Sequence, residues 1–224
     1  MLSFFKEYKK FAIVFLIISI IIVSIIYNKL NVYQPLPVYQ PAMVSSDLVD
    51  STIQYQKKYH KIADFNLINQ NGKTITQNDY KDKIYVADFF FTTCQTICPI
   101  MTNHMATIQD RIKNDDDVML LSFSVTPEID SVAQLKKYAI EKGVDDSKWN
   151  LVTGDKKQIY DLARKSYLAV KTTGDGGPFD MIHTENFMLI DKKRQIRGFY
   201  DGTNPEDIDR LMDDIKILKQ EYTQ

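Results

Sequence analysis

The sequence predicts an α/β domain with a mixed sheet flanked by helices, preceded by one transmembrane helix. Apolar strand-like runs alternate with amphipathic helical segments from about residue 62 onward, and an uncharged run lies near the N-terminus. Of the 224 residues, 44% are hydrophobic and 25% are charged, so the chain can bury a core. A formal net charge of −1 argues against a nucleic-acid partner, which is usually bound by a dense basic patch.

The N-terminal run, residues 11–26, contains no charge, and Lys6, Lys9 and Lys10 precede it. A helix of this length covers roughly 24 Å at ~1.5 Å per residue, slightly less than a ~30 Å hydrocarbon core. Tyr27 and the flanking lysines can complete the crossing by lying in the interface. A cleaved signal peptide begins in the same way, but no small-x-small cleavage site follows the run. The lysines predict a cytoplasmic N-terminus and an extracytoplasmic domain, most readily at a bacterial inner membrane facing the periplasm.

The chain is accordingly divided into four predicted parts. They are a basic cytoplasmic N-terminus (1–10), a transmembrane anchor (11–27), a linker (28–61) and a globular domain (62–224). Prolines at positions 35, 37 and 41 favour an extended, semi-rigid linker, in which a short helix is expected near Ser46.

The domain opens with a predicted hairpin at 64–76, in which Asn71-Gly72 supplies the turn. The continuous apolar run 83–91 is typical of a buried central strand, and 99–112 has apolar residues at helical spacing after Pro99. The remaining expected elements are a strand at 118–125, a helix at 131–143, a strand at 149–154, a helix at 156–167, a hairpin of strands 185–191 and 195–200, and a helix at 205–220. This order predicts one mixed sheet.

Two short charged runs interrupt these elements. The acidic run 115–117 is interpreted as a polar loop, and the basic run from Lys192 to Arg197 as a solvated hairpin turn.

The two cysteines of the chain, Cys94 and Cys98, follow the central strand at the start of a predicted helix. Free amides and the helix dipole stabilise a thiolate there and lower its pKa below ~8.5. Residues at i and i+4 share a helical face with Cβ atoms roughly 6 Å apart, so the pair can form a disulfide or bind one ion. A purely structural disulfide is disfavoured, because it would close a very short loop. The pair therefore predicts a chemical site.

Three stretches carry a resemblance to a known family: F-x-F-T-x-C-x-x-x-C-P at Phe89–Pro99, TPEID at Thr126–Asp130 and IHTENFMLID at Ile182–Asp191. They resemble the Sco (SenC-like) copper-assembly proteins of the thioredoxin superfamily. The resemblance implies a thioredoxin-like fold and copper binding by Cys94, Cys98 and His183. It further implies a metallochaperone rather than a classical enzyme, which delivers Cu(I) to the copper-receiving subunit of cytochrome c oxidase.

The ligand chemistry is compatible with that implication. Two thiolates and one imidazole suit three-coordinate Cu(I), and Cu(II) needs only an added oxygen ligand, whereas closed zinc sites normally have four protein ligands. His60 precedes the predicted core and His104 points to another helical face, so neither is expected to bind metal. Met101 and Met105 fall at core spacing, while Met181 remains a candidate auxiliary thioether.

The sequence departs from the family pattern at three positions. Many members have an aromatic residue or histidine where Thr93 stands, and an aspartate where Thr126 and Ile182 stand. These departures concern the surroundings of the metal rather than its ligands.

Asp88 supports an alternative function. It lies inside the apolar strand six residues before Cys94, where a buried carboxylate is costly without a partner or a role. This spacing resembles that of thioredoxins, in which an aspartate accepts a proton during disulfide exchange. The alternative is a thiol–disulfide oxidoreductase that reduces the cysteines of a copper-receiving partner, with Cys94 and Cys98 as its redox pair. A non-catalytic interaction module remains a third class, in which both cysteines would be dispensable.

Overall fold

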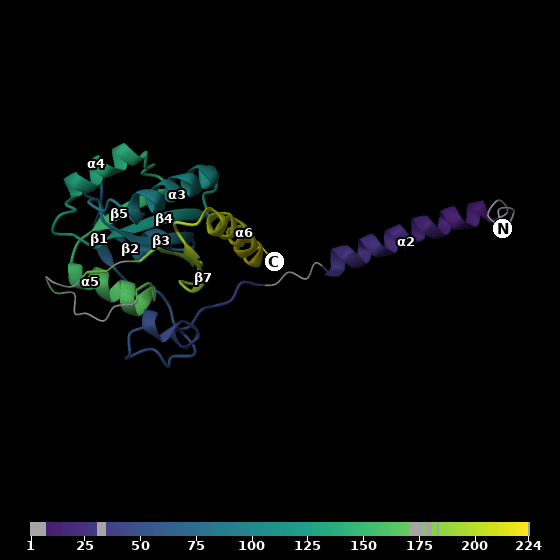
Figure 1. The fold of residues 1–224 in the computed structure, drawn as a ribbon, viewed down its shortest axis with the longest axis horizontal. Helices are drawn as coiled ribbons and strands as arrows, with labels where there is room; N and C mark the ends of the chain where they lie inside the picture. Colours follow the sequence, from purple (N-terminus) through teal and green to yellow (C-terminus); the bar gives the residue numbers. More distant parts are fainter. Residues whose placement is uncertain (1–7, 31–34, 171–176, 178–180, 183, 224) are drawn as a thin grey trace. The chain divides into compact units, whose positions relative to one another are not determined.

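The computed structural model describes residues 8–30, 35–170, 177, 181–182 and 184–223 (Figure 1). The chain forms two compact units, Met1–Pro35 and Leu36–Gln224. The first contains helix α2 (Lys9–Leu30). Within the described part of the chain, α2 is the one helix long and apolar enough to cross a membrane, with a mean hydropathy of 2.6 over Lys9–Ile26. A signal sequence meets the same criterion.

The second unit, which we call the compact unit, contains seven strands and four α-helices among its described residues. The strands are β1 (Asn66–Asn69), β2 (Thr74–Thr76), β3 (Ile84–Phe90), β4 (Val118–Ser124), β5 (Trp149–Thr153), β6 (Asn186–Ile190) and β7 (Ile196–Asp201). The helices are α3 (Ile97–Ile112), α4 (Val132–Lys142), α5 (Lys156–Asp161) and α6 (Pro205–Glu221), with a π-helical turn η4 (Leu162–Ser166) after α5. Short 3-10 turns are η1 (Pro41–Met43), η2 (Ser46–Leu48) and η3 (Gln77–Tyr80).

The strands form one mixed sheet in the order β2-β1-β5-β4-β3-β6-β7. The central strands β3, β4 and β5 are parallel, because helices α3 and α4 return the chain between them. The outer pairs β1–β5, β3–β6 and β6–β7 are antiparallel. The predicted mixed α/β sheet is confirmed, and its central strand β3 is buried along its whole length.

Helices cover both faces of the sheet (Figure 1). Buried side chains of α3, α4 and α6 pack on one face, including Met101, Leu135 and Leu211. The other face is covered by α5 and by the segment that precedes β1, through Ile159 and Ile62. The loops after the carboxyl ends of β3 and β4 therefore meet at one edge of the sheet, which we call the cysteine edge because Cys94 follows β3 there.

Local sequence signals explain several boundaries. The β1–β2 hairpin turns at Gly72, whose φ of 73° is easily adopted by glycine. Helix α4 begins after Ser131, whose hydroxyl accepts a hydrogen bond from the amide of Gln134, and ends at Gly143 with φ 68°. Helix α6 begins with Pro205 after the capping residue Asn204.

Residues 36–61, expected to form most of the linker, pack against the sheet. The Tyr39 amide donates to the Ile196 carbonyl (2.9 Å) and the Ile62 amide to the Arg194 carbonyl (2.8 Å). The helix expected near Ser46 is only the 3-10 turn η2. The compact unit consequently begins at Leu36, before the globular part expected from Ile62.

Arg197 corrects the interpretation of the basic run. Residues 192–195 do form a turn, but the Arg197 side chain is only 4% exposed. Its guanidinium pairs with Asp191 (3.1 Å) and Glu221 (2.6 Å) and donates to the carbonyl of Leu36 (2.7 Å). Glu221 also accepts from the Leu36 amide (2.8 Å), so this ion-pair cluster fixes the place where the chain joins the compact unit.

Candidate functional site

The two cysteines lie where the chain passes from β3 into α3. Strand β3 ends at Phe90 and α3 begins at Ile97, so Cys94 occupies the connecting turn and Cys98 the first helical turn. The expected placement of both residues on one helical face does not apply, because Cys94 precedes the helix. The two thiols are nevertheless brought together by the turn and are not joined in a disulfide.

Backbone groups hold the turn between β3 and α3, residues 91–96, which we call the cysteine turn. The Cys98 amide at the start of α3 donates a hydrogen bond to Cys94 Sγ (3.4 Å), and the Cys94 amide donates to the Phe91 carbonyl (3.3 Å). The Thr96 hydroxyl lies 3.7 Å from Cys94 Sγ. Cys98 is only 3% exposed, whereas Cys94 is half-buried and reachable from solvent. The predicted stabilisation of a thiolate by a helix amide is thus present at Cys94.

The two thiols differ strongly in acidity. Burial tends to raise the pKa of Cys94, but hydrogen bonds from the Cys98 thiol and from backbone amides lower it to about 7. Burial, together with the hydrogen bond that its thiol donates to Cys94, raises the pKa of Cys98 to about 12. At neutral pH the accessible cysteine is therefore about half thiolate and the buried cysteine is a thiol, an asymmetry suited to nucleophilic attack by Cys94.

Asp88 lies on β3, the strand that leads to this pair, and is 2% exposed. The Ser122 hydroxyl on β4 donates to its carboxylate and in turn accepts from Trp149 Nε1 (2.8 Å). Burial raises the pKa of Asp88 to about 7, against the opposing effect of the Ser122 hydrogen bond. The charge of the Asp88 carboxylate also helps to raise the pKa of Cys98.

Asp130 is a functional candidate that the sequence reasoning did not single out. Its fully buried carboxylate accepts hydrogen bonds from the Thr92 hydroxyl (2.5 Å) and amide (3.2 Å). It also accepts from the hydroxyls of Ser124 (2.6 Å) and Thr126 (3.1 Å). Because Thr92 is two residues before Cys94, Asp130 fixes the approach to the cysteine turn from the neighbouring loop.

A signal for Asp130 was available in the sequence. It is the last residue of TPEID and directly precedes Ser131, which caps α4. Thr126 donates to the Asp130 carboxylate and adds no second charge beside it. Gln134 Nε2 donates to the Thr92 hydroxyl (3.0 Å), which leaves that hydroxyl to donate its proton to Asp130.

His183, the expected third ligand, lies outside the described residues. Within those residues, no three His, Cys, Asp or Glu side chains are grouped as metal ligands. The pairing of Ala87 with Met188 brings the start of β6 to the cysteine edge, where β3 ends. On either side of position 183, Ile182 and Thr184 are buried, at 1% and 6% exposure. The chain next to that position is therefore held against the domain near this edge.

The other two histidines have structural partners. The His60 ring hydrogen-bonds the Ser166 carbonyl (2.7 Å), and the His104 ring hydrogen-bonds the Gly202 carbonyl (2.7 Å). Each ring is thus engaged by a backbone carbonyl. Met101 and Met105 are fully buried in the core, which confirms their packing role, while Met181 is 42% exposed.

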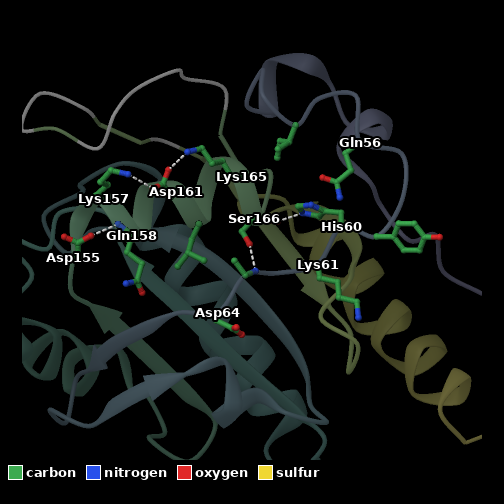
Figure 2. A pocket seen from close by; sticks show the side chains of 14 residues that line it. Gln56, His60, Lys61, Asp64, Asp155, Lys157, Gln158, Asp161, Lys165 and Ser166 are labelled. Atoms are coloured by element: carbon green, nitrogen blue, oxygen red, sulfur yellow. Dashed lines mark hydrogen bonds and ion pairs between the residues drawn. The ribbon is translucent and has the colours of Figure 1, made fainter.

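A separate cavity of about 690 Å³ lies between the segment before β1 and α5 with its π-turn (Figure 2). Its acidic residues are engaged: Asp161 pairs with Lys157 (2.9 Å) and Lys165 (2.7 Å), as the dashed lines show. Its lining contains no cysteine. The cysteine turn, rather than this cavity, therefore carries the candidate chemistry.

The arrangement offers two kinds of chemistry. Two adjacent sulfur donors at an accessible helix start suit a soft metal ion. The same pair, with one acidic thiol, one buried thiol and a buried carboxylate on the preceding strand, suits thiol–disulfide exchange. These features define a sheet-and-helix domain with a paired-cysteine site.

Comparison with known proteins places that domain in a family. The family model described as SCO1/SenC matches residues 53–220, so the chain belongs to the SCO1/SenC family. The "SCO1 protein homolog" of Bacillus subtilis is 34% identical over 159 residues, which is 70% of this chain and 82% of that protein.

Two solved structures extend the likeness to the fold. The first is BsSco, described as a member of the Sco family of cytochrome c oxidase assembly proteins with a disulfide switch. It matches at TM-score 0.61 and 33% identity, over 73% of this chain and 95% of its own. The second is Arabidopsis thaliana ScoI with copper bound, at TM-score 0.56 and 29% identity, over 70% and 98%. The expected thioredoxin-like Sco fold is confirmed.

Proposed function

We propose that this chain is a membrane-anchored copper chaperone that holds Cu(I) on Cys94, Cys98 and His183 and delivers it during cytochrome c oxidase assembly. The observation that carries the proposal is the pair of free thiols with the Cys98 amide aimed at Cys94 Sγ. Family membership supports it, since a relative binds copper and another belongs to the oxidase assembly proteins. The copper-receiving subunit of that oxidase is the proposed partner.

The proposed chemistry follows from the donor set. Cys94 binds as the thiolate it already forms near neutral pH, whereas Cys98 must lose its proton when the metal arrives. A soft, three-coordinate ion can accept an incoming thiolate from a partner before one of the chain's own ligands leaves. The partial exposure of Cys94 leaves room for that approach.

A Cu(I) competition titration of the reduced full chain in detergent tests this function. We expect one Cu(I) bound per chain, with affinity lowered at least about ten-fold by His183→Ala, because one of three ligands is lost. His104→Ala is the matched control, since His104 contacts a backbone carbonyl instead. Equally weak binding by all three proteins would make copper incidental to the site.

We also propose that α2 anchors the chain with its N-terminus in the cytoplasm, on the basis of its apolar length and the lysines that precede residue 11. Protease added outside spheroplasts should then cleave the compact unit and leave the N-terminus intact. Release of the whole chain without the helix would indicate a cleaved signal sequence instead.

A second function, thiol–disulfide exchange, is favoured by the acidity difference between the cysteines and by the buried carboxylate of Asp88 on the preceding strand. In this proposal Cys94 thiolate attacks a disulfide of the partner and releases one partner thiolate. Cys98 then passes its proton to Asp88 and attacks Cys94 Sγ, which releases the second thiolate. Two electrons move to the partner, and an external thiol reductant restores the Cys94–Cys98 pair.

Asp88→Asn separates this function from copper binding. The variant should slow the second, resolving step of disulfide reduction and leave Cu(I) affinity within about three-fold, because Asp88 contributes no ligand. The measurement is rapid-quench trapping of the mixed disulfide with a model dithiol substrate. Unchanged resolution in the variant would remove Asp88 from the exchange mechanism.

A further inference from the structure

The segment from Tyr55 to Lys61 has no role in the site described above, yet it presents an unusual surface. Its sequence, YQKKYHK, contains three lysines and two tyrosines and no acidic residue. Tyr55 is 80% exposed and Tyr59 is 87% exposed, the highest exposures among large hydrophobic side chains of the described compact unit. Two exposed aromatic rings four residues apart on one short segment give it an apolar contact area beside its lysines.

The segment is held in place rather than loose. The His60 amide donates to the Gln40 side chain (2.9 Å), and its ring hydrogen-bonds the Ser166 carbonyl (2.7 Å; Figure 2). The Gln56 side chain donates to the Lys58 carbonyl (3.1 Å). The buried His60 thus pins a chain whose tyrosines point outward. Tyr59 itself has φ 67°, a strained conformation for a bulky residue.

The lysines of this segment are available to an external anion. Lys57, Lys58 and Lys61 are exposed, and no carboxylate among the described residues pairs with any of them. The compact unit as a whole is acidic: four of the 28 basic residues and one of the 29 acidic residues precede Leu36, which leaves it a net charge of −4. A local cluster of three unpaired lysines therefore stands out against the charge of its own unit.

Strand register places this segment at a defined end of the sheet. Tyr85 at the start of β3 pairs with Ile190, so the β6–β7 turn lies at the edge opposite the cysteine edge. The Ile62 amide, directly after the segment, bonds the Arg194 carbonyl in that turn. Leu36, where the chain joins the compact unit, is bonded to Arg197 next to the same turn. The segment and the point of chain attachment thus share one edge.

We propose that Tyr55–Lys61 is a membrane-surface contact that rests the compact unit on anionic lipid headgroups. Tyrosine rings favour the bilayer interface, and lysines near an anionic surface each favour binding by about five-fold. The inference rests on the proposed anchoring by α2, which supplies the nearby bilayer. Contact at this edge leaves the opposite, cysteine edge facing water and open to a protein partner.

The full chain reconstituted in vesicles tests the inference by hydrogen exchange. Lys57, Lys58 and Tyr59 amides have no hydrogen-bond partner among the described residues, so they exchange quickly unless lipid covers them. With about 30% phosphatidylglycerol in phosphatidylcholine, we expect exchange across 55–61 to slow roughly ten-fold relative to pure phosphatidylcholine. About 0.5 M salt should abolish the difference, because the Debye length falls below about 5 Å.

Charge-removal variants provide the matched comparison. Lys57→Gln/Lys58→Gln/Lys61→Gln should lose the slowing, whereas Lys81→Gln/Lys113→Gln/Lys137→Gln, also exposed lysines, should retain it. Equal exchange in both vesicle types, with the chain resisting alkaline extraction, would overturn the lipid contact and favour a protein as the occupant. If alkaline buffer extracts the chain from the vesicles, the result contradicts the proposed anchoring by α2 instead. The contact is then judged by binding of the chain to anionic vesicles, which only the first triple variant should lose.

Discussion

Two buried aspartates at opposite edges of the sheet are stabilised in different ways. Asp191 lies at the edge opposite the cysteine edge, where Leu36 joins the compact unit; we call this the attachment edge. The Asp191 carboxylate is paired with the Arg197 guanidinium, which also binds Glu221 and the Leu36 carbonyl. Asp130, at the cysteine edge, accepts only from neutral groups: the amide and hydroxyl of Thr92 and two further hydroxyls. One carboxylate is neutralised by a cation and the other is solvated by dipoles.

The difference suits what each edge has to do. At the attachment edge, a charge cluster ties the incoming chain to β7 and α6 and has no further chemistry to accommodate. At the cysteine edge, a fixed cation next to Cys94 would repel an arriving metal ion and perturb the thiol pair. Neutral donors hold the turn in place without adding positive charge. This comparison makes three predictions, ordered from the largest expected effect to the smallest.

Removing the cation should be the most damaging change. Arg197→Met leaves Asp191 and Glu221 without their partner, and loss of one member of a buried ion pair typically costs about 3–5 kcal/mol. Urea unfolding of the full chain in non-ionic detergent measures the change. Arg111→Met is the matched control, because the Arg111–Asp209 pair is exposed and should contribute less than about 1 kcal/mol. Equal losses in the two variants would contradict the assigned role of the buried cluster.

A third buried carboxylate, Asp88, should make stability depend on pH. Burial raises its pKa from 3.8 to about 7, so between those values the native state binds a proton that the unfolded chain has lost. This contribution is complete below about pH 4 and disappears as pH rises through about 7. Its size is on the order of 2–4 kcal/mol.

Comparison with Asp88→Asn isolates that contribution. The variant keeps an acceptor for the Ser122 hydroxyl but cannot titrate. Wild-type stability, measured on reduced protein, should fall relative to the variant between pH 4 and 7. Parallel pH profiles for the two proteins would show that the Asp88 carboxyl titrates normally.

Removing one of the neutral donors to Asp130 should cause the smallest loss of stability, but this loss should be accompanied by a change at the cysteine site. Thr92→Val removes a hydroxyl that donates to the buried carboxylate, at an expected cost of about 1–3 kcal/mol. It should also change the rate at which Cys94 is alkylated near pH 7, since the turn is less firmly held. Thr92→Ser keeps the hydroxyl and should restore both properties. Destabilisation by Thr92→Val with unchanged Cys94 reactivity would reduce Asp130 to a structural role.

The spacing of apolar residues within each segment was sufficient to predict the sheet. Continuous apolar runs such as 83–91 require burial on both faces, and Asn71-Gly72 and Gly143 mark a turn and a helix end by backbone preference alone. The position of Cys94 and Cys98 beside a strand end and a helix start follows from the same local rules. Asp88 was visible as a carboxylate interrupting an apolar strand, and its expected burial in that strand is confirmed.

Tertiary structure alone decided which distant polar groups meet. Asp130 and Thr92 belong to different loops, and only the parallel pairing of β3 with β4 brings them together. From the sequence alone, Arg197 is interpreted as part of a solvated basic turn. In the folded chain it is buried, because Leu36 and Glu221 of α6 pack against it. Backbone propensity and hydrophobic period are properties of neighbouring residues and can be read from the chain. The choice of a hydrogen-bond or ion-pair partner depends on which elements pack against each other, and that is settled only in the folded molecule.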